Sequence, residues 1–278
     1  MLVDDNDVAG VQAIVKEAGE ILRAHYHSAT FAIDFKKDHS PLTDADRDSN
    51  THIVDGLRRL YPRVPVISEE SDLPDYRSRA GWDLVWIVDP LDGTEEFIER
   101  NGRFCVNVAL VERKTPIFGM INIINDDEIL WGATGKGCHL CKGDQTEPVR
   151  PPVRQGKRLR VGVSRFHVME EEFRYIDLLQ KRGHDVEIVP LSASSKYGMV
   201  AKGEIDIAPK FGRCFEWDVA AGHALVEASG GLVINAQTGG KITYNNTSVL
   251  TPPLVMYGAR VHELIRGGNA DFLPTLTR

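Results

Sequence analysis

The feature that most constrains this fold is a short apolar run that ends in an acidic turn. Residues 85–88 are four consecutive apolar residues, a pattern typical of a buried strand. Asp89 and Asp92 follow it. Pro90 stiffens the bend between them, and Gly93 permits a tight turn. The stretch therefore predicts a strand that delivers two carboxylates into a turn.

The residues after the turn predict a helix. Thr94 can cap its N-terminus, and Glu95 and Glu96 fall in its first turn, where carboxylates interact favourably with the helix dipole. The helix is expected to end near residues 101–102. Carboxylates can hold a hard cation while backbone N–H groups hold an anion, so the stretch suits a metal-bound phosphate. An acidic turn before a capped helix explains it equally well.

Composition narrows the class of protein. With 278 residues and 42% hydrophobic content, the chain can bury a full core as one large domain or two. The net charge of −7 argues against binding a nucleic-acid polymer or an anionic membrane surface, and it leaves a small phosphorylated ligand as the expected partner. The sequence has no secretory signal, no transmembrane run and only four scattered cysteines. We therefore expect a cytoplasmic protein.

The remaining patterns predict an α/β protein in two parts. A polar, proline-containing segment at 144–158 predicts a junction between an N-terminal α+β domain over residues 1–150 and a C-terminal α/β domain over residues 151–278. Strands and helices alternate beyond the junction, which implies a sheet covered by helices. In the first part, helices are expected over 8–22 and from 44 to 61, and strands over 31–35, 64–67, 104–111, 117–124 and 128–133.

Three segments place acidic residues where a strand or loop meets a helix. They hold Glu69 with Glu70, Asp89 with Asp92, and Asp218. If these side chains converge, their like charges raise one another's pKa and oppose folding. Divalent cations would remove that conflict, and all-oxygen ligation favours Mg²⁺, Mn²⁺ or Ca²⁺ over zinc. Sequence spacing alone leaves open that they are ordinary surface carboxylates.

Four segments resemble, in the same order, the motifs of the inositol monophosphatase superfamily. Residues 89–94, Asp-Pro-Leu-Asp-Gly-Thr, match its first signature, and residues 217–222, Trp-Asp-Val-Ala-Ala-Gly, resemble its second. Residues 68–71 resemble its Glu-Glu segment, and residues 41–46 its Thr-x-x-Asp segment. The resemblance implies an α-β-α-β-α sandwich and a Mg²⁺-dependent, Li⁺-sensitive phosphomonoesterase.

The resemblance also implies a role for each matching residue. Asp46 and Thr94 would orient and deprotonate the attacking water, with Glu69 also among the catalytic residues. The N–H groups of Gly93 and Thr94 would bind phosphate oxygens. Two metals close together can steady both the attacking and the leaving oxygen. The implied ligands of two or three Mg²⁺ ions are Glu69, Asp89, the carbonyl of Leu91, Asp92 and Asp218.

Within the superfamily, Glu96 and Phe97 resemble the branch of CysQ-type 3'(2'),5'-bisphosphate nucleotidases. This branch implies hydrolysis of adenosine 3',5'-bisphosphate to AMP and phosphate. A second phosphate needs a cationic subsite, and Lys210 is the first candidate because the branch has a basic residue there. The implied substrate-binding residues are Gly93, Thr94, Arg165, His167, Ser194, Lys196 and Lys210.

Two other functions stay open: an inositol monophosphatase of the same fold, and a non-catalytic metal-binding scaffold. Glu95 stands where the nucleotidase branch usually has Lys, and an inward carboxylate would weaken anion binding. The family often forms homodimers, so a homodimer is compatible with the resemblance. Cys138 and Cys141 invite a zinc or redox role, but the sequence lacks a second pair at zinc-site spacing, and we expect an ordinary exposed strand or hairpin.

Overall fold

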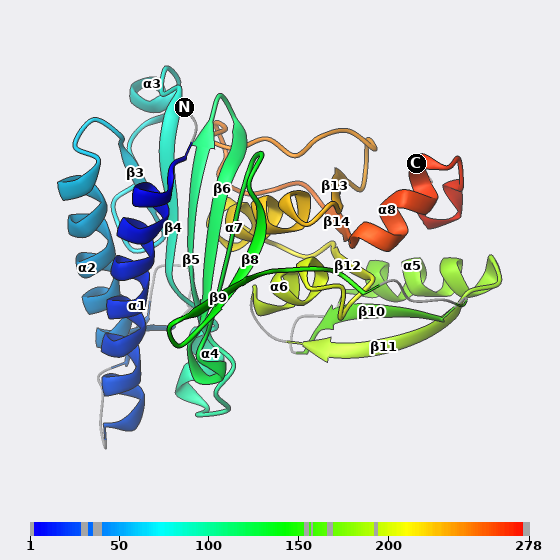
Figure 1. Ribbon diagram of the computed structural model, residues 1–278, viewed down its shortest axis with the longest axis horizontal. Coiled ribbons are helices and arrows are strands. Elements are labelled where there is room, and N and C mark those ends of the chain that lie inside the picture. Colours follow the sequence, from blue (N-terminus) through cyan, green and yellow to red (C-terminus); the bar gives the residue numbers. More distant parts are fainter. Residues whose placement is uncertain are drawn as a thin grey trace.

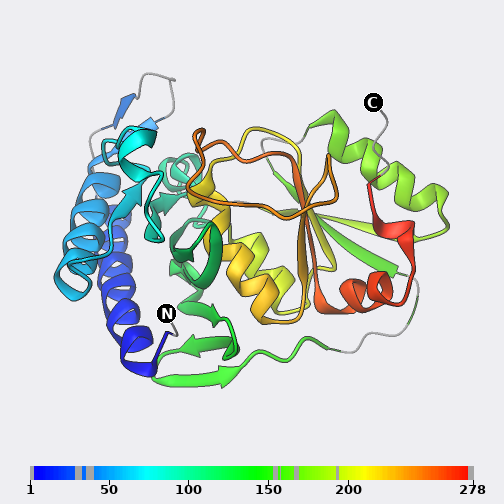
Figure 2. The ribbon, with the colours of Figure 1, turned by 90° about the horizontal axis from the view of Figure 1, so that it is seen from above.

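The computed structural model describes residues 3–28, 33–35, 41–152, 156, 158–165, 169–191 and 194–274. These residues form five layers, two sheets that alternate with three layers of helices (Figures 1 and 2). This arrangement is the α-β-α-β-α sandwich expected from the sequence. Among the described residues, none of the helices has the length and apolarity of a membrane span.

The first layer holds two long N-terminal helices, α1 (Asp5–His27) and α2 (Asp44–Leu60). Asp4 and Thr43 cap them, each in a reciprocal capping box. Apolar side chains at helical spacing bury one face of α1 against α2 and the large sheet. Both predicted helices are confirmed, and α1 extends beyond the predicted range at both ends.

The large sheet has seven strands in the order β3-β4-β5-β6-β7-β8-β9, and only the β3–β4 pair is parallel. Val85 and Ile87 of β4 face the central helices, whereas Trp86 and Val88 face α1 and α2. Both faces of β4 are therefore buried, which explains its unbroken apolar run. The strands are β3 (Val66–Ser68), β4 (Leu84–Asp92), β5 (Cys105–Glu112), β6 (Thr115–Ile123), β7 (Glu128–Ala133), β8 (Gly137–Lys142) and β9 (Gln145–Pro148).

The central layer consists of α6 (Ser195–Ala201) and α7 (Glu216–Ala228), which lie between the two sheets (Figure 2). Helix α7 is buried over most of its circumference. Gly119 of β6 permits its close approach, because a Cβ there would lie 2.3 Å from the carbonyl oxygen of Ala221. This contact fixes the height of α7 above the sheet.

The second sheet has five strands in the order β11-β10-β12-β14-β13, of which β11, β10 and β12 are parallel. Helices α5 (Glu170–Lys181) and α8 (Ala259–Arg266) cover its outer face. The sequence patterns did not predict β14 or α8. The strands are β10 (Arg158–Ser164), β11 (Asp185–Leu191), β12 (Ile207–Lys210), β13 (Leu232–Asn235) and β14 (Leu254–Tyr257).

The short elements lie at the ends of the layers. Strands β1 (Ile33–Phe35) and β2 (Pro41–Thr43) form a separate antiparallel pair, and residues 31–32 of the predicted strand lie outside the described residues. Helix α3 (Tyr76–Arg79) precedes β4, and α4 (Thr94–Ile98) follows it. Two 3₁₀ turns span Ile124–Asp126 and Ala270–Phe272.

The chain passes from the large sheet to the second sheet after β9. Part of the segment 144–158, expected to be an irregular junction, is therefore a strand. The apolar core between the sheets combines side chains from both halves of the chain, among them Ile121 and Leu225. The division into two domains at residue 150 stays a prediction.

Candidate active site

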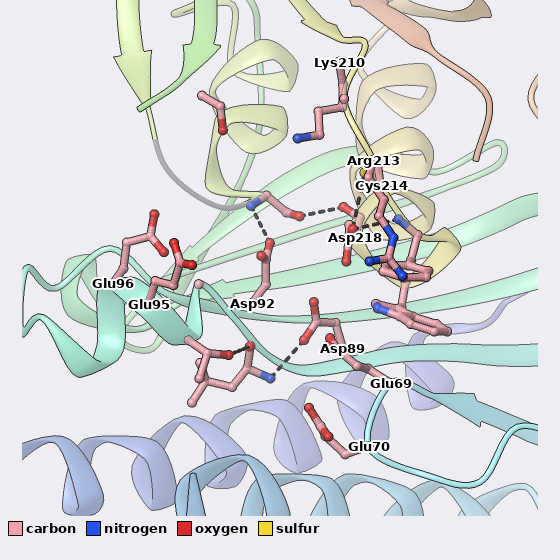
Figure 3. A pocket seen from close by; sticks show the side chains of 18 of the residues that line it. Glu69, Glu70, Asp89, Asp92, Glu95, Glu96, Lys210, Arg213, Cys214 and Asp218 are labelled. Carbon is pink, nitrogen blue, oxygen red and sulfur yellow. Dashed lines mark hydrogen bonds between the residues drawn. The ribbon is translucent and has the colours of Figure 1, made fainter. Parts of the chain in front are cut away.

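Three carboxylates from distant parts of the chain meet at one end of the large sheet. One oxygen each of Glu69, Asp89 and Asp218 lies within 4.8 Å of the other two. Glu69 directly follows β3, Asp89 belongs to β4, and Asp218 lies in the first turn of α7. The parallel pairing of β3 with β4 places Glu69 beside Asp89, and its N–H donates to the carbonyl of Val88 at 3.1 Å. Figure 3 shows the three side chains around one cavity.

The turn at the end of β4 is held by contacts on both sides. The pairing with β5 shifts register between Asp89 and Asp92. Asp89 Oδ1 accepts the N–H of Leu91 at 3.1 Å, and Ser49 Oγ donates to the carbonyl of Pro90 at 2.8 Å. Gly93 then adopts a left-handed conformation (φ 92°), which favours glycine.

The prediction that Thr94 caps the following helix is wrong. Gly93 occupies the N-cap position of α4, and Thr94 is the first helical residue. The Thr94 hydroxyl instead lies 3.3 Å from both the carbonyl of Leu91 and Asp46 Oδ1. Helix α4 also ends at Ile98, earlier than predicted. The threonine side chain therefore points toward Asp46 and the Leu91 carbonyl and does not cap the helix.

Asp46 lies behind Thr94 and is completely buried. Its Oδ2 accepts hydrogen bonds from the Thr43 N–H at 2.7 Å and the Thr43 hydroxyl at 2.6 Å, which leaves Oδ1 facing Thr94. The capping box of α2 thus fixes the orientation of this carboxylate. Thr94 lines the cavity, and its hydroxyl connects the cavity to Asp46, which lies behind it.

Asp92 connects the sheet to the central helices. Its Oδ2 accepts hydrogen bonds from the Ser194 N–H at 2.5 Å and from Asn107 Nδ2 at 3.3 Å. The Ser194 hydroxyl donates to the carbonyl of Asp218 at 2.6 Å. Ser194 was expected to bind substrate. In the structure it lines the cavity and bridges Asp92 to the start of α7.

Without a cation, full ionisation of this carboxylate cluster is strongly unfavourable. Burial, reinforced by Glu69, Asp92 and Asp218, raises the pKa of Asp89 well above its ordinary range. Burial and then Asp92 and Glu69 raise the pKa of Asp218 to about 7. Such a cluster of hard oxygen donors fits a divalent cation, which would neutralise the repulsion.

The opposite side of the cavity is cationic. Lys196 of α6 is only 4% exposed, and Lys210 ends β12 and points into the cavity (Figure 3). Burial and then the charge of Lys210 lower the pKa of Lys196. Across the described ranges, neither ammonium group forms an ion pair with a carboxylate. Both lysines were expected to bind substrate, and the structure brings them to the same cavity as the carboxylates.

The other predicted substrate residues are placed differently. Arg165 is exposed and is not among the described residues that line the cavity. His167 lies outside the described residues. Glu70, Glu95 and Glu96 line the acidic side of the cavity, and of the three only Glu95 is exposed. The whole cavity has a volume of about 1120 Å³.

Comparison with known families now places the chain. The sequence model described as the inositol monophosphatase family matches residues 4–266. The chain belongs to the inositol monophosphatase family.

Relatives within this family include enzymes named 3'(2'),5'-bisphosphate nucleotidase CysQ. The chain is 37% identical to the one from Salmonella typhimurium over 222 residues, which covers 78% of this chain and 85% of the relative. It is 33% identical to the one from Buchnera aphidicola over 236 residues, which covers 84% of this chain and 86% of the relative.

Solved structures of the family share the fold. CysQ from Bacteroides thetaiotaomicron superimposes with a TM-score of 0.82 at 35% identity, covering 92% of this chain and 98% of the other. An IMPase from Thermotoga maritima superimposes with a TM-score of 0.75 at 22% identity, covering 94% and 95%. At 22% identity, the similarity to the Thermotoga maritima structure concerns the fold alone.

The family motifs did not indicate how the cysteines are arranged. Cys138 and Cys141 lie on β8 but belong to different core clusters on opposite faces of the sheet, so they do not form one metal or redox site. Both are buried, which corrects the expectation of an exposed strand. Cys214 lies beside a site carboxylate, with Sγ 3.3 Å from Asp218 Oδ2.

Sequence reasoning also missed several residues that line the cavity, among them Arg213, Phe215 and Trp217. These three precede Asp218 at alternate positions in the chain, and the place of Trp217 inside a family signature was the available signal. The mutual stacking of their side chains is visible only in three dimensions.

Proposed function

We propose that this chain is a metal-dependent phosphomonoesterase that removes one phosphate from a 3'(2'),5'-bisphosphate nucleotide. Adenosine 3',5'-bisphosphate would yield AMP and phosphate. The observation that carries the proposal is a single cavity that joins a carboxylate centre to Lys196 and Lys210. One side suits a cation with the scissile phosphate, and the other suits a second anionic group. The names of the CysQ relatives support the same substrate class.

We infer that Mg²⁺ is the cation. Glu69, Asp89, Asp92 and Asp218 would hold two or three such ions together with the carbonyl of Leu91, because hard carboxylate and carbonyl oxygens are preferred by Mg²⁺. When bound, Mg²⁺ supplies positive charge that stabilises the reacting phosphoryl group and makes water a stronger acid. The raised pKa values of Asp89 and Asp218 support this assignment, since without a cation the carboxylates repel one another.

Thr94 and Asp46 would position the attacking water. The Thr94 hydroxyl carries one hydrogen, which it can donate to Asp46 Oδ1 at 3.3 Å. Its oxygen then remains able to accept a hydrogen bond from a water in the cavity. A proton leaving that water can pass through the hydroxyl to the carboxylate. Because Asp46 is held by Thr43, the pair is oriented before substrate binds.

Lys196 and Lys210 would bind the second phosphate. The two ammonium groups, one of them buried, repel each other, and among the described residues neither forms an ion pair with a carboxylate. A phosphate between them would remove this repulsion with charge-assisted hydrogen bonds. An inositol monophosphate has no second phosphate to place there, so the lysine pair favours the bisphosphate nucleotide over that alternative.

A phosphate-release panel tests the proposal. Purified protein is assayed with adenosine 3',5'-bisphosphate, inositol 1-phosphate and fructose 1,6-bisphosphate, each with and without Mg²⁺. We expect the highest kcat/KM on the nucleotide and no release without the metal. The Asp92→Asn variant should be inactive on all three while keeping its circular dichroism spectrum. A non-catalytic scaffold would release phosphate from none of them, and a preference for inositol 1-phosphate would replace the proposed substrate class.

A further inference from the structure

Three side chains on the wall of the cavity form a stack. The guanidinium carbon of Arg213 lies 4.8 Å from the centre of the Phe215 ring. The Phe215 ring lies 4.8 Å from that of Trp217, with an angle of only 12° between their planes. All three residues line the cavity that holds the carboxylates and the lysines. Figure 3 draws Arg213 together with Asp218 among the side chains that line this cavity.

We propose that this stack is a subsite for the nucleobase of the substrate, which stacks on the guanidinium plane of Arg213. The inference rests on the proposed function, because it specifies which part of the nucleotide the wall recognises. The Phe215 ring contacts both Trp217 and Arg213, and of the three side chains Arg213 is the exposed one, so it is the member that a ligand can reach. Planar bases stack favourably on guanidinium groups and aromatic rings. Stacking tolerates different bases because each has a π face.

The stack is rigidly connected to the carboxylate centre. The Phe215 N–H donates to Asp218 Oδ2 at 2.8 Å, and Trp217 precedes Asp218 in the first turn of α7. Phe215 also pairs with Leu250 in an isolated β-bridge, and the Cys214 carbonyl accepts the Thr251 N–H at 2.9 Å. The base would therefore be held at a fixed offset from the scissile phosphate, which favours productive orientation.

The size of the cavity agrees with a ligand that has three parts. A volume of about 1120 Å³ lies slightly above the usual range of roughly 300–1,000 Å³ for small-molecule sites, so the cavity has room for a large ligand. The carboxylates, the lysine pair and the stack all line it. A sugar or inositol phosphate would leave the stack without a planar partner. The stack thus selects for nucleotides, independently of the lysines.

The experiment compares adenosine 3',5'-bisphosphate with the same ribose bisphosphate lacking the base. The measured quantity is kcat/KM for the substrate with the base divided by kcat/KM for the substrate without it. Phe215→Leu removes the ring below Arg213, and we expect the ratio to fall about tenfold. Phe215→Tyr keeps an aromatic ring and should restore the ratio. Arg213→Lys keeps the charge and removes the planar group, and it should also lower the ratio several-fold.

Matched controls separate the stack from general effects. Phe173→Leu and Arg174→Lys make the same substitutions on exposed residues of α5 that are not among the cavity residues, and they should leave the ratio unchanged. If Phe215→Leu unfolds, the Arg213→Lys variant tests the proposal instead, because Arg213 is exposed and its replacement leaves the core intact. A wild-type protein that hydrolyses neither bisphosphate refutes the proposed function. Normal hydrolysis with a ratio that Arg213→Lys and folded Phe215→Leu do not change refutes the nucleobase subsite alone.

Discussion

Replacing Asp218 by Asn should make the protein more stable than wild type without divalent metal and less stable than wild type with it. Asp218 lies close to Glu69 and Asp89, and burial, followed by the charges of Asp92 and Glu69, raises its pKa to about 7. The unfolded chain therefore loses this proton near pH 4, whereas the folded chain keeps it until about pH 7. Between these values the folded state binds more protons, so the stability of the wild-type protein falls as pH rises.

The size of the effect follows from the pKa. A shift of about three units corresponds to roughly 4 kcal/mol at about 1.4 kcal/mol per unit. Asp218 borders a solvent-filled cavity and shares its proton with neighbouring carboxylates, so we expect Asn to recover about half of this, roughly 2 kcal/mol above pH 7. That gain should raise Tm by about 5 °C in the absence of metal. Near pH 4 the variant and the wild-type protein should unfold at similar temperatures.

Bound metal should reverse this order of stability, so that the wild-type protein becomes the more stable of the two. A cation at 100 times its Kd stabilises the wild-type protein by about 2.7 kcal/mol, and Asp218→Asn should lose most of this gain with its turnover. The assay is thermal unfolding at pH 5, 7 and 8, with a chelator and with Mg²⁺. A useful control is Asp206→Asn: Asp206 is also buried, but it pairs with Arg260 at 3.3 Å, so its replacement should destabilise the protein in both conditions. If the metal-free Asp218→Asn protein is less stable than wild type at pH 8, or keeps near-normal turnover, the reasoning is refuted.

Three further predictions concern single residues. Thr94→Val should lower kcat about 100-fold because it removes the hydroxyl between Asp46 and the cavity, while Thr94→Ser should keep most activity; equal kcat values for the two variants in steady-state assays would contradict the water-positioning role. Lys210→Glu should reduce kcat/KM for the bisphosphate nucleotide more than for inositol 1-phosphate, and an equal loss on both would show that Lys210 does not select the substrate. Gly119→Ala should destabilise the protein by about 2 kcal/mol in urea unfolding, because the added methyl lies 2.3 Å from the carbonyl of Ala221; an unchanged midpoint would show that α7 can move away without loss.

Several elements could be predicted because their causes are local. The apolar stripe and the capping box of Thr43 with Asp46 define α2 within a few residues of sequence. The apolar run before Asp89 defines β4, since a strand buried on both faces excludes polar residues. Strand β14 and helix α8 were not predicted, although β14 is a run of four buried apolar residues and α8 is amphipathic; their packing shows only in the second sheet.

The turn after β4 shows where local reasoning fails. Thr94 is a good capping residue by propensity, and the sequence offers no reason to reject it. In the fold, its hydroxyl lies between the Leu91 carbonyl and Asp46, a residue from another helix, and Gly93 takes the cap position through its left-handed backbone. A contact distant in sequence thus overrides the local preference.

The sequence by itself determined the family, the layered fold and the chemical identity of the carboxylates, because these depend on residue types and their order along the chain. Only the tertiary structure decided that Glu69, Asp89 and Asp218 share one site and that Arg213 and Phe215 form a stack beside it. The physical reason is that the carboxylate site depends on the parallel pairing of β3 with β4 and on the depth at which α7 packs over β6, whereas the segment of the stack is held by the bridge of Phe215 with Leu250. These contacts join residues that are far apart in the sequence, so the spacing of residues along the chain does not reveal them.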